Sequence, residues 1–118
     1  MKALTKAEEQ VMKTVWKLGG GLLMEIVGGM PDPQPHKNTV ATILKTLVDK
    51  DFIAIENLGR IHRYLPLVSK SQYSGSSLSH LANGYFNDSF PEVVSFLVEE
   101  KKLTVSDLEL LLQQLKKK

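Results

Sequence analysis

The sequence predicts a mostly α-helical fold with one small β-hairpin, and three observations lead to this prediction. An amphipathic helical pattern covers residues 39–49, with apolar side chains three and four residues apart. Two β-prone runs, 52–56 and 61–65, follow it and flank a short turn that contains Gly59. After Pro66 the pattern is helical throughout. A helix followed directly by a hairpin is typical of a winged helix-turn-helix, which places one helix in the DNA major groove.

The composition sets limits on the class of protein. The chain has 118 residues, 42% of them hydrophobic, so it can form a real core. It contains no cysteine, which excludes disulfides and thiolate metal sites. The N-terminus lacks the apolar segment of a secretion signal, and no apolar run reaches the roughly 20 residues that span a bilayer. We therefore expect a cytoplasmic protein without membrane insertion. The net charge of +2 does not by itself indicate a nucleic-acid binder.

The first expected helix follows a capping box formed by Thr5 and Glu8, in which each side chain can bond the other residue's backbone N–H. The helix runs to about Leu18, and the three glycines 19–21 end it. Its apolar side includes Trp16, which we expect in the core rather than in a ligand site.

The segment that links the first helix to the amphipathic helix is short and broken. We expect a very short strand or extended segment at residues 22–23 and a short helix over residues 24–27, ended by a pair of glycines. Three prolines make residues 30–37 a loop. Asn38 or Thr39 can cap the next helix.

This next helix has an apolar side and a small polar side. The apolar side, which must face a core, consists of Val40, Ile43, Leu44, Leu47 and Val48. On the other side, hydroxyl and amide groups can bond base edges and phosphates, and lysine can reach a phosphate or a guanine. The alternative is that this side is an ordinary solvent-exposed helix face with no binding role. We expect DNA contacts from Lys37, Asn38, Thr39, Thr42, Lys45 and Thr46.

The hairpin adds two candidate DNA contacts. Arg60 lies beside Gly59 at the tip, where it can enter a minor groove or bind a phosphate. His62 and Arg63 follow one another on the return strand, so they point to opposite faces. We favour Arg63 because it keeps its charge at every relevant pH. Arg60 and Arg63 therefore complete the expected DNA-binding set.

The pattern divides the chain into a winged-helix DNA-binding domain over residues 1–67 and a helical dimerisation domain over residues 68–118. Three helices are expected in the second domain, at about 70–87, from Pro91, and from Thr104 or Ser106. Three short helices do not easily bury all of their apolar surface against one another. A second copy of the chain is the simplest partner that could cover it. We expect dimer contacts from Tyr73, Leu81, Tyr85, Phe96, Leu97, Leu108, Leu111, Leu112 and Leu115.

In four segments the chain resembles the penicillinase-repressor (BlaI/MecI/CopY) family of winged-helix transcriptional repressors. Residues 4–16, including the tryptophan, resemble the family's first helix, and residues 38–47 resemble its T-V-x-T-x-L-x-x-L recognition helix. Residues 50–66 resemble its wing, and residues 96–112 resemble its C-terminal dimerisation helices. The order and spacing of these segments are more specific than any one of them.

The resemblance implies a homodimer that binds double-stranded operator DNA and represses genes for antibiotic or metal resistance. Palindromic half-sites would match the two-fold symmetry of such a dimer. In the β-lactam branch of the family, a membrane sensor protease triggers cleavage at an Asn-Phe bond. This bond falls on Ser95-Phe96, where the phenylalanine matches and the asparagine does not. The copper-responsive branch uses a cysteine cluster, which this chain lacks.

Other functions have weaker support in the sequence. No catalytic motif is present, so we expect no enzyme, no catalytic residue, no cofactor and no metal site. One alternative is a winged helix that binds a protein instead of DNA. Another is a small-molecule-responsive regulator that uses Tyr73, Tyr85 and Phe86, and scattered histidines leave zinc binding open.

Overall fold

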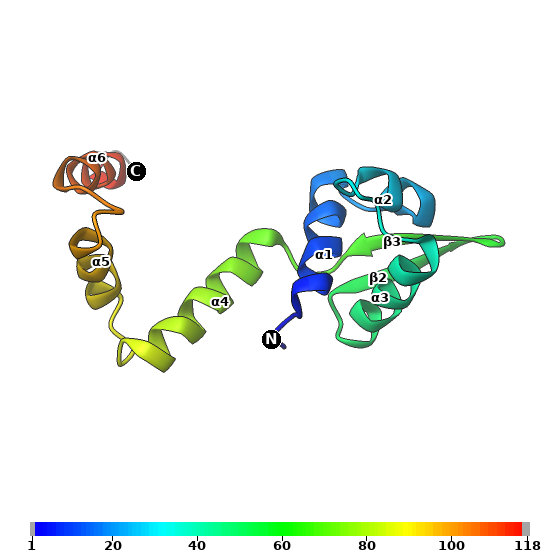
Figure 1. Ribbon diagram of the computed structural model, residues 1–118, viewed down its shortest axis with the longest axis horizontal. Coiled ribbons are helices and arrows are strands. Elements are labelled where there is room, and N and C mark those ends of the chain that lie inside the picture. Colours follow the sequence, from blue (N-terminus) through cyan, green and yellow to red (C-terminus); the bar gives the residue numbers. More distant parts are fainter. Residues whose placement is uncertain (1, 117–118) are drawn as a thin grey trace. The chain divides into compact units, whose positions relative to one another are not determined.

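The computed structural model describes residues 2–116 (Figure 1). The chain divides into two compact units, one ending at Ser76 and the other beginning at Ser77. Three helices, a three-stranded sheet and the start of α4 (Lys70–Tyr85) form the first unit. The rest of α4 and two further helices form the second. The structure confirms the predicted fold class, a mostly helical winged helix-turn-helix.

Helix α1 (Lys6–Leu18) begins and ends as predicted. The Thr5 backbone N–H donates to Glu8 Oε1 over 2.7 Å, and the Glu8 N–H donates to the Thr5 hydroxyl over 3.2 Å. This capping box satisfies two backbone donors that a helix start leaves without partners. At the other end, Gly19 has a φ of 74°, the left-handed conformation that glycine adopts without a Cβ penalty.

A two-residue strand, β1 (Gly21–Leu22), leads into α2 (Leu23–Gly29). The prediction that the glycine pair ends this helix was wrong by two residues, because both glycines take part in its last turn. The following proline-rich segment has no regular structure, as predicted.

Helix α3 (Lys37–Asp49) begins one residue earlier than predicted, and its cap is His36. Imidazole Nδ1 of His36 accepts a hydrogen bond from the Asn38 N–H over 3.1 Å. The prediction of Asn38 or Thr39 as the cap was therefore wrong. Histidine was missed because the usual capping side chains are Ser, Thr, Asp and Asn.

The sheet is antiparallel, with strand order β1–β3–β2. Strands β2 (Ile53–Leu58) and β3 (Ile61–Pro66) pair up to Leu58 and Ile61, so Gly59 and Arg60 alone connect them. The turn is therefore tighter than the predicted four residues. Gly59 has a φ of 70°, as a two-residue hairpin turn requires.

The core of the first unit lies between its helices and its sheet. Trp16 and Tyr64 pack against it from the edge, partly buried. A Cβ on Gly20 would lie 2.7 Å from the Tyr64 carbonyl oxygen, so the chain needs a glycine where it crosses the sheet. The side chains with less than 2% exposure are Val11, Met12, Val15, Ile26, Val40, Leu44, Leu47, Phe52 and Ile53.

The second unit contains the end of α4, α5 (Phe90–Glu99) and α6 (Val105–Lys116). Ser89 caps α5 by accepting from the Glu92 N–H over 3.2 Å. Thr104 and Asp107 form a capping box before α6, with both bonds at 3.0 Å. Helix α4 stops at Tyr85, two residues before the predicted end.

Candidate nucleic-acid interface

The two sides of α3 differ in burial as the sequence predicted. On the apolar side, Val40, Leu44 and Leu47 have no exposed surface. The polar side chains point to solvent or are only partly covered. Those classed as exposed are Lys37, Asn38, Thr39, Thr42, Lys45 and Asp49, whereas Thr46 is partly buried. The helix thus presents a 13-residue rod whose polar side has no packing role in the core.

An ion pair holds the end of α3 against the start of α1. Lys50 Nζ lies 2.8 Å from Glu8 Oε1, and the same ammonium group lies 3.4 Å from the Ala3 carbonyl oxygen. Glu8 is 5% exposed, and burial of this kind disfavours a charged carboxylate. Hydrogen bonds from Lys50 and from Thr5 outweigh burial and hold the pKa of Glu8 below its ordinary value of 4.5. The carboxylate is therefore charged at neutral pH and helps to fix α3 in place.

Most backbone N–H groups in the first turn of α3 already have an acceptor within the chain. His36 satisfies the Asn38 N–H through its side chain, and its carbonyl accepts from the Thr39 and Val40 N–H groups at 3.0 and 3.2 Å. Lys37 follows the cap and is exposed. The positive end of the helix dipole and this ammonium group together favour an anion such as a phosphate.

Two threonine hydroxyls on α3 bond to their own helix. Thr42 donates to the Asn38 carbonyl over 3.0 Å, and Thr46 donates to the Thr42 carbonyl over 3.2 Å. Each hydroxyl oxygen still has capacity to accept a hydrogen bond, and each methyl group can contact an apolar edge such as a thymine methyl. Lys45, between them in the sequence, has no hydrogen bond within the described chain and is exposed.

The hairpin tip projects past α2 and α3 (Figure 1). Arg60 occupies the second position of its two-residue turn and is exposed. Leu58 and Ile61, which pair with each other next to the turn, are 51% and 53% exposed. The tip therefore carries one positive charge, Arg60, next to the exposed apolar pair Leu58 and Ile61. A hairpin tip of this shape can enter a DNA groove.

The register of the sheet places His62 and Arg63 on opposite faces. Arg63 lies directly between Leu22 of β1 and Glu56 of β2. His62 lies opposite Asn57, and its Nδ1 is 2.6 Å from the Asn57 side-chain oxygen. His62 shares a face with Tyr64, which packs on the core, so Arg63 lies on the other face of the sheet.

Sequence reasoning missed two residues that position α3. His36 was read as part of a loop, and its signal was only its place directly before the helix. Lys50 directly follows the predicted helical pattern, and no local spacing connects it to Glu8, which lies 42 residues earlier. The only signal in the sequence was the position of Glu8 on the side of the helix that faces the core, because a buried carboxylate needs a cation from elsewhere in the chain.

Most of the residues expected at a dimer interface carry exposed apolar surface in the single chain. Tyr73, Leu97 and Leu108 are partly buried, and the exposed fraction of the other six is 44% or more. Phe96 also packs edge-on against Phe86, with ring centroids 5.6 Å apart. The exposed residues of the expected set are Leu81, Tyr85, Phe96, Leu111, Leu112 and Leu115.

Tyr73 requires a correction, because the structure uses it within the first unit. Its ring lies 5.9 Å from that of Trp16 and 5.6 Å from that of Phe52. Its hydroxyl accepts from the Leu4 N–H at 3.2 Å and donates to Glu9 Oε1 at 3.3 Å. Tyr73 thus anchors the start of α4 to α1, where helical spacing alone had suggested a dimer contact or a ligand box.

Two other features concern partners and ligands. The Ser95-Phe96 bond lies inside α5, and both residues are exposed. Within residues 2–116, no three histidine, aspartate or glutamate side chains are grouped so that they could hold a metal ion. Over the same residues, the helices are too short or too polar to cross a membrane.

Comparison with known proteins identifies the family. No curated protein matches the chain. A solved structure of the CopR repressor is 33% identical in sequence, and the match covers 58% of this chain and 100% of that one with a TM-score of 0.48. The family model of the penicillinase repressor matches residues 4–117. This match spans nearly the whole chain and confirms the resemblance seen in the sequence. The chain belongs to the penicillinase repressor family of DNA-binding transcriptional repressors.

Proposed function

We propose that the protein binds a palindromic operator as a homodimer, with α3 in the major groove and the hairpin on the neighbouring backbone. One observation carries the proposal. Most of the polar side of α3 is exposed and the hairpin projects past this helix, while Val40, Leu44 and Leu47 on the apolar side are fully buried (Figure 1). Bound there, the dimer would repress by blocking polymerase.

The proposed contacts divide into two classes. Asn38, Thr42 and Lys45 share one side of α3 and would meet base edges or phosphates, with Thr39 and Thr46 on its flank. Lys37 at the helix start and the two hairpin arginines, Arg60 and Arg63, would bind phosphate or enter the minor groove. Phosphate contacts set the position on the duplex, and base contacts set the sequence that is read.

The exposed apolar side chains after α4 support the homodimer. Chain segments 1–67 and 68–118 would then serve as DNA-binding and dimerisation domains. A second copy covers such a surface symmetrically, because the same patch meets itself across a two-fold axis. Two linked half-sites also raise affinity well above that of one.

Membership of the family supports a more specific role in resistance. We infer that the protein controls resistance genes and that a membrane sensor protease inactivates it near Ser95-Phe96. Cleavage there would cut α5 and separate α6 from the rest of the chain. Mass spectrometry of the repressor from β-lactam-treated cells should detect fragments that end at this bond, and an intact repressor under inducing conditions would contradict cleavage.

A mobility-shift assay on the DNA upstream of the protein's own gene tests the main proposal. Lys45→Ala and Arg60→Ala should each weaken binding, and each should lower the salt slope by about one if the lost contact is a phosphate. Lys102→Ala, which removes an exposed lysine of the second unit, is the matched control and should bind as the unchanged protein does. Equal loss in all three variants would point to nonspecific charge attraction.

A second candidate function is binding of a protein through the same face. Asp49 on the exposed side of α3 and the net charge of only +2 favour it. This candidate predicts no shift with any promoter fragment at low salt, whereas the repressor predicts a shift that unlabelled operator removes.

A further inference from the structure

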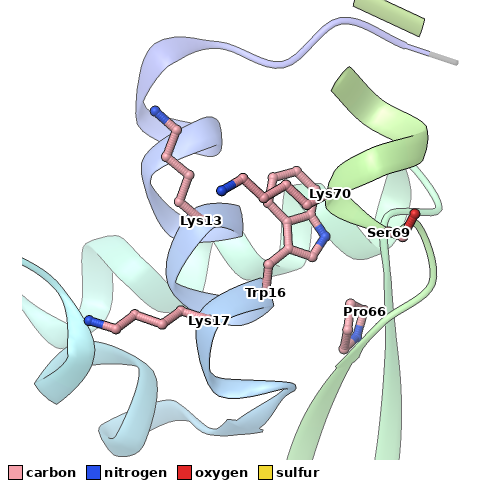
Figure 2. Close-up of a pocket in the computed structure, with 6 residues that line it drawn as sticks. All are labelled: Lys13, Trp16, Lys17, Pro66, Ser69 and Lys70. Carbon is pink, nitrogen blue, oxygen red and sulfur yellow. The ribbon is translucent and has the colours of Figure 1, made fainter. Parts of the chain in front are cut away.

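A hollow of about 610 Å³ opens on the first unit beside Trp16, away from the residues assigned to DNA. It lies where α1, the end of β3 and the start of α4 meet. Figure 2 shows the Lys70 side chain extending past the indole of Trp16 toward Lys13, whereas Lys17 extends away from Trp16. The lining residues are Lys13, Trp16, Lys17, Pro66, Ser69 and Lys70.

The hollow has an unbalanced positive charge. Three of its lining residues are lysines, and none of the described lining residues is acidic. The ion pairing found among residues 2–116 is that of Lys50 with Glu8, so these three lysines have no carboxylate within 4.0 Å there. Glu9, one helical turn before Lys13, accepts a hydrogen bond from the Tyr73 hydroxyl instead. Like charges gathered at one opening repel each other and favour an anion between them.

The wall of the hollow is flat and apolar. The indole N–H of Trp16 already donates to the Val68 carbonyl over 2.7 Å, so the ring has no further polar bond to give. What remains for a ligand is the partly exposed ring of Trp16 and the ring of Pro66. An aromatic ring stacks well on such a surface because the indole face is large and rigid.

Ser69 also lines the hollow, and in Figure 2 its hydroxyl points away from the lysine ammonium groups. The Ser69 hydroxyl oxygen accepts from the Gln72 N–H at 3.0 Å, while its own proton is available to donate. Ser69 also lies directly before the 16-residue helix α4, whose N-terminus carries partial positive charge. An anion in the hollow would therefore be held mainly by the ammonium groups of Lys13 and Lys70.

We propose that this hollow binds a small aromatic anion, with its charge between Lys13 and Lys70 and its ring against Trp16 and Pro66. The inference is independent of the operator proposal, because none of these residues belongs to the DNA-binding set. An occupant would connect α1 with the first turn of α4 and should stabilise the first unit in proportion to its concentration.

Trp16 is the only tryptophan of the chain, so its fluorescence reports on this hollow directly. Titration of the full-length protein with sodium benzoate should change the Trp16 emission in a saturable way, with a Kd of about a millimolar for so small a ligand. Benzamide has the same ring without the charge, and inorganic phosphate has charge without a ring. Both should bind at least about tenfold more weakly, since each lacks one of the two interactions.

The double variant Lys13→Gln/Lys70→Gln should raise the Kd for benzoate at least about tenfold while keeping the fold, because both side chains are exposed. Lys6→Gln, an exposed lysine of the same helix outside the hollow, is the matched control and should leave the Kd unchanged. Benzamide binding as tightly as benzoate, or the double variant binding as the control does, would overturn the proposal. So would a glutamate-rich peptide that binds more tightly than benzoate, because the hollow would then serve a protein segment.

Discussion

The two units of the chain use their apolar side chains in opposite ways. In the first unit, nine large side chains have less than 2% of their surface exposed. In the second unit, α5 and α6 contain no buried residue among those described, although both carry clear apolar stripes. Exposed apolar surface of this extent usually marks a site of protein contact. The comparison teaches that one chain suffices to form the core of the first unit, while the apolar side chains of α5 and α6 stay largely uncovered in the single chain.

The largest expected effect concerns the core of the first unit. Phe52→Ala removes a ring that is 1% exposed and contacts Tyr73, so it should lower the free energy of unfolding by about 3–5 kcal/mol. Urea titration followed by Trp16 fluorescence measures this unit selectively. A loss below about 1 kcal/mol would mean that the first unit is less tightly packed than its burial indicates.

The next effect tests whether the second unit needs a partner. Leu112→Asp places a charge in its exposed apolar surface and should halve the mass measured by light scattering. Operator affinity should then fall by about 100-fold, since the half-sites are no longer linked. Gln113→Asp adds the same charge at an exposed polar position of α6 and should preserve the dimer. If the Leu112→Asp protein still had twice the mass of one chain, the exposed apolar surface of the second unit would not be what holds the dimer together.

A smaller effect is expected at the ion pair that positions α3. Glu8→Gln keeps a side chain that can cap α1 but loses the charge that Lys50 faces, so it should cost about 1–2 kcal/mol at pH 7. The pKa of Glu8 is lowered in the folded state, so its contribution is fully present above about 4.5 and disappears as the pH falls through that lower pKa. The difference between protein and variant should therefore shrink in acid.

Glu109→Gln, at an exposed site in the second unit, is the control for this ion pair and should be nearly neutral. Equilibrium unfolding at pH 7 and at pH 3 distinguishes the two variants. A Glu8→Gln difference that stays constant between these pH values would exclude the charge as its source.

The last comparison substitutes one glycine in each unit, and the two changes in stability should have opposite signs. Gly84→Ala lies near the end of α4 with open space around it and should increase helix stability by about 0.5 kcal/mol. Gly20→Ala has a φ of +109° and a carbonyl oxygen 2.7 Å from the new Cβ, so it should cost at least about 1–2 kcal/mol. Thermal melting measures both, and a gain from Gly20→Ala would disprove the close approach of the chain to β3.

Local chemistry explains why much of the fold could be predicted. The Thr5–Glu8 capping box, the left-handed Gly19 and the apolar spacing of α3 act within a few residues, and all three are confirmed. The hairpin followed from two β-prone runs around Gly59. Periodicity also identified which side of α3 is buried, and this limits the proposed DNA contacts to its other side.

Long-range contacts explain what could not be predicted. Glu8 meets Lys50 across 42 residues, and Tyr73 reaches Leu4 across 69. Helical spacing placed Tyr73 on the apolar face of its helix, but it did not show which residues that face contacts. The cap at His36 is local instead, and it was missed because histidine is an uncommon capping residue.

By itself the sequence determined the winged helix, the buried side of its third helix and the family, because periodic burial and capping are properties of neighbouring residues. Only the tertiary structure decided how α3 is anchored, which face of the hairpin carries Arg63, and that lysines from two helices meet around Trp16. These features arise when elements distant along the chain pack together. The spacing of residues within one segment does not determine that packing.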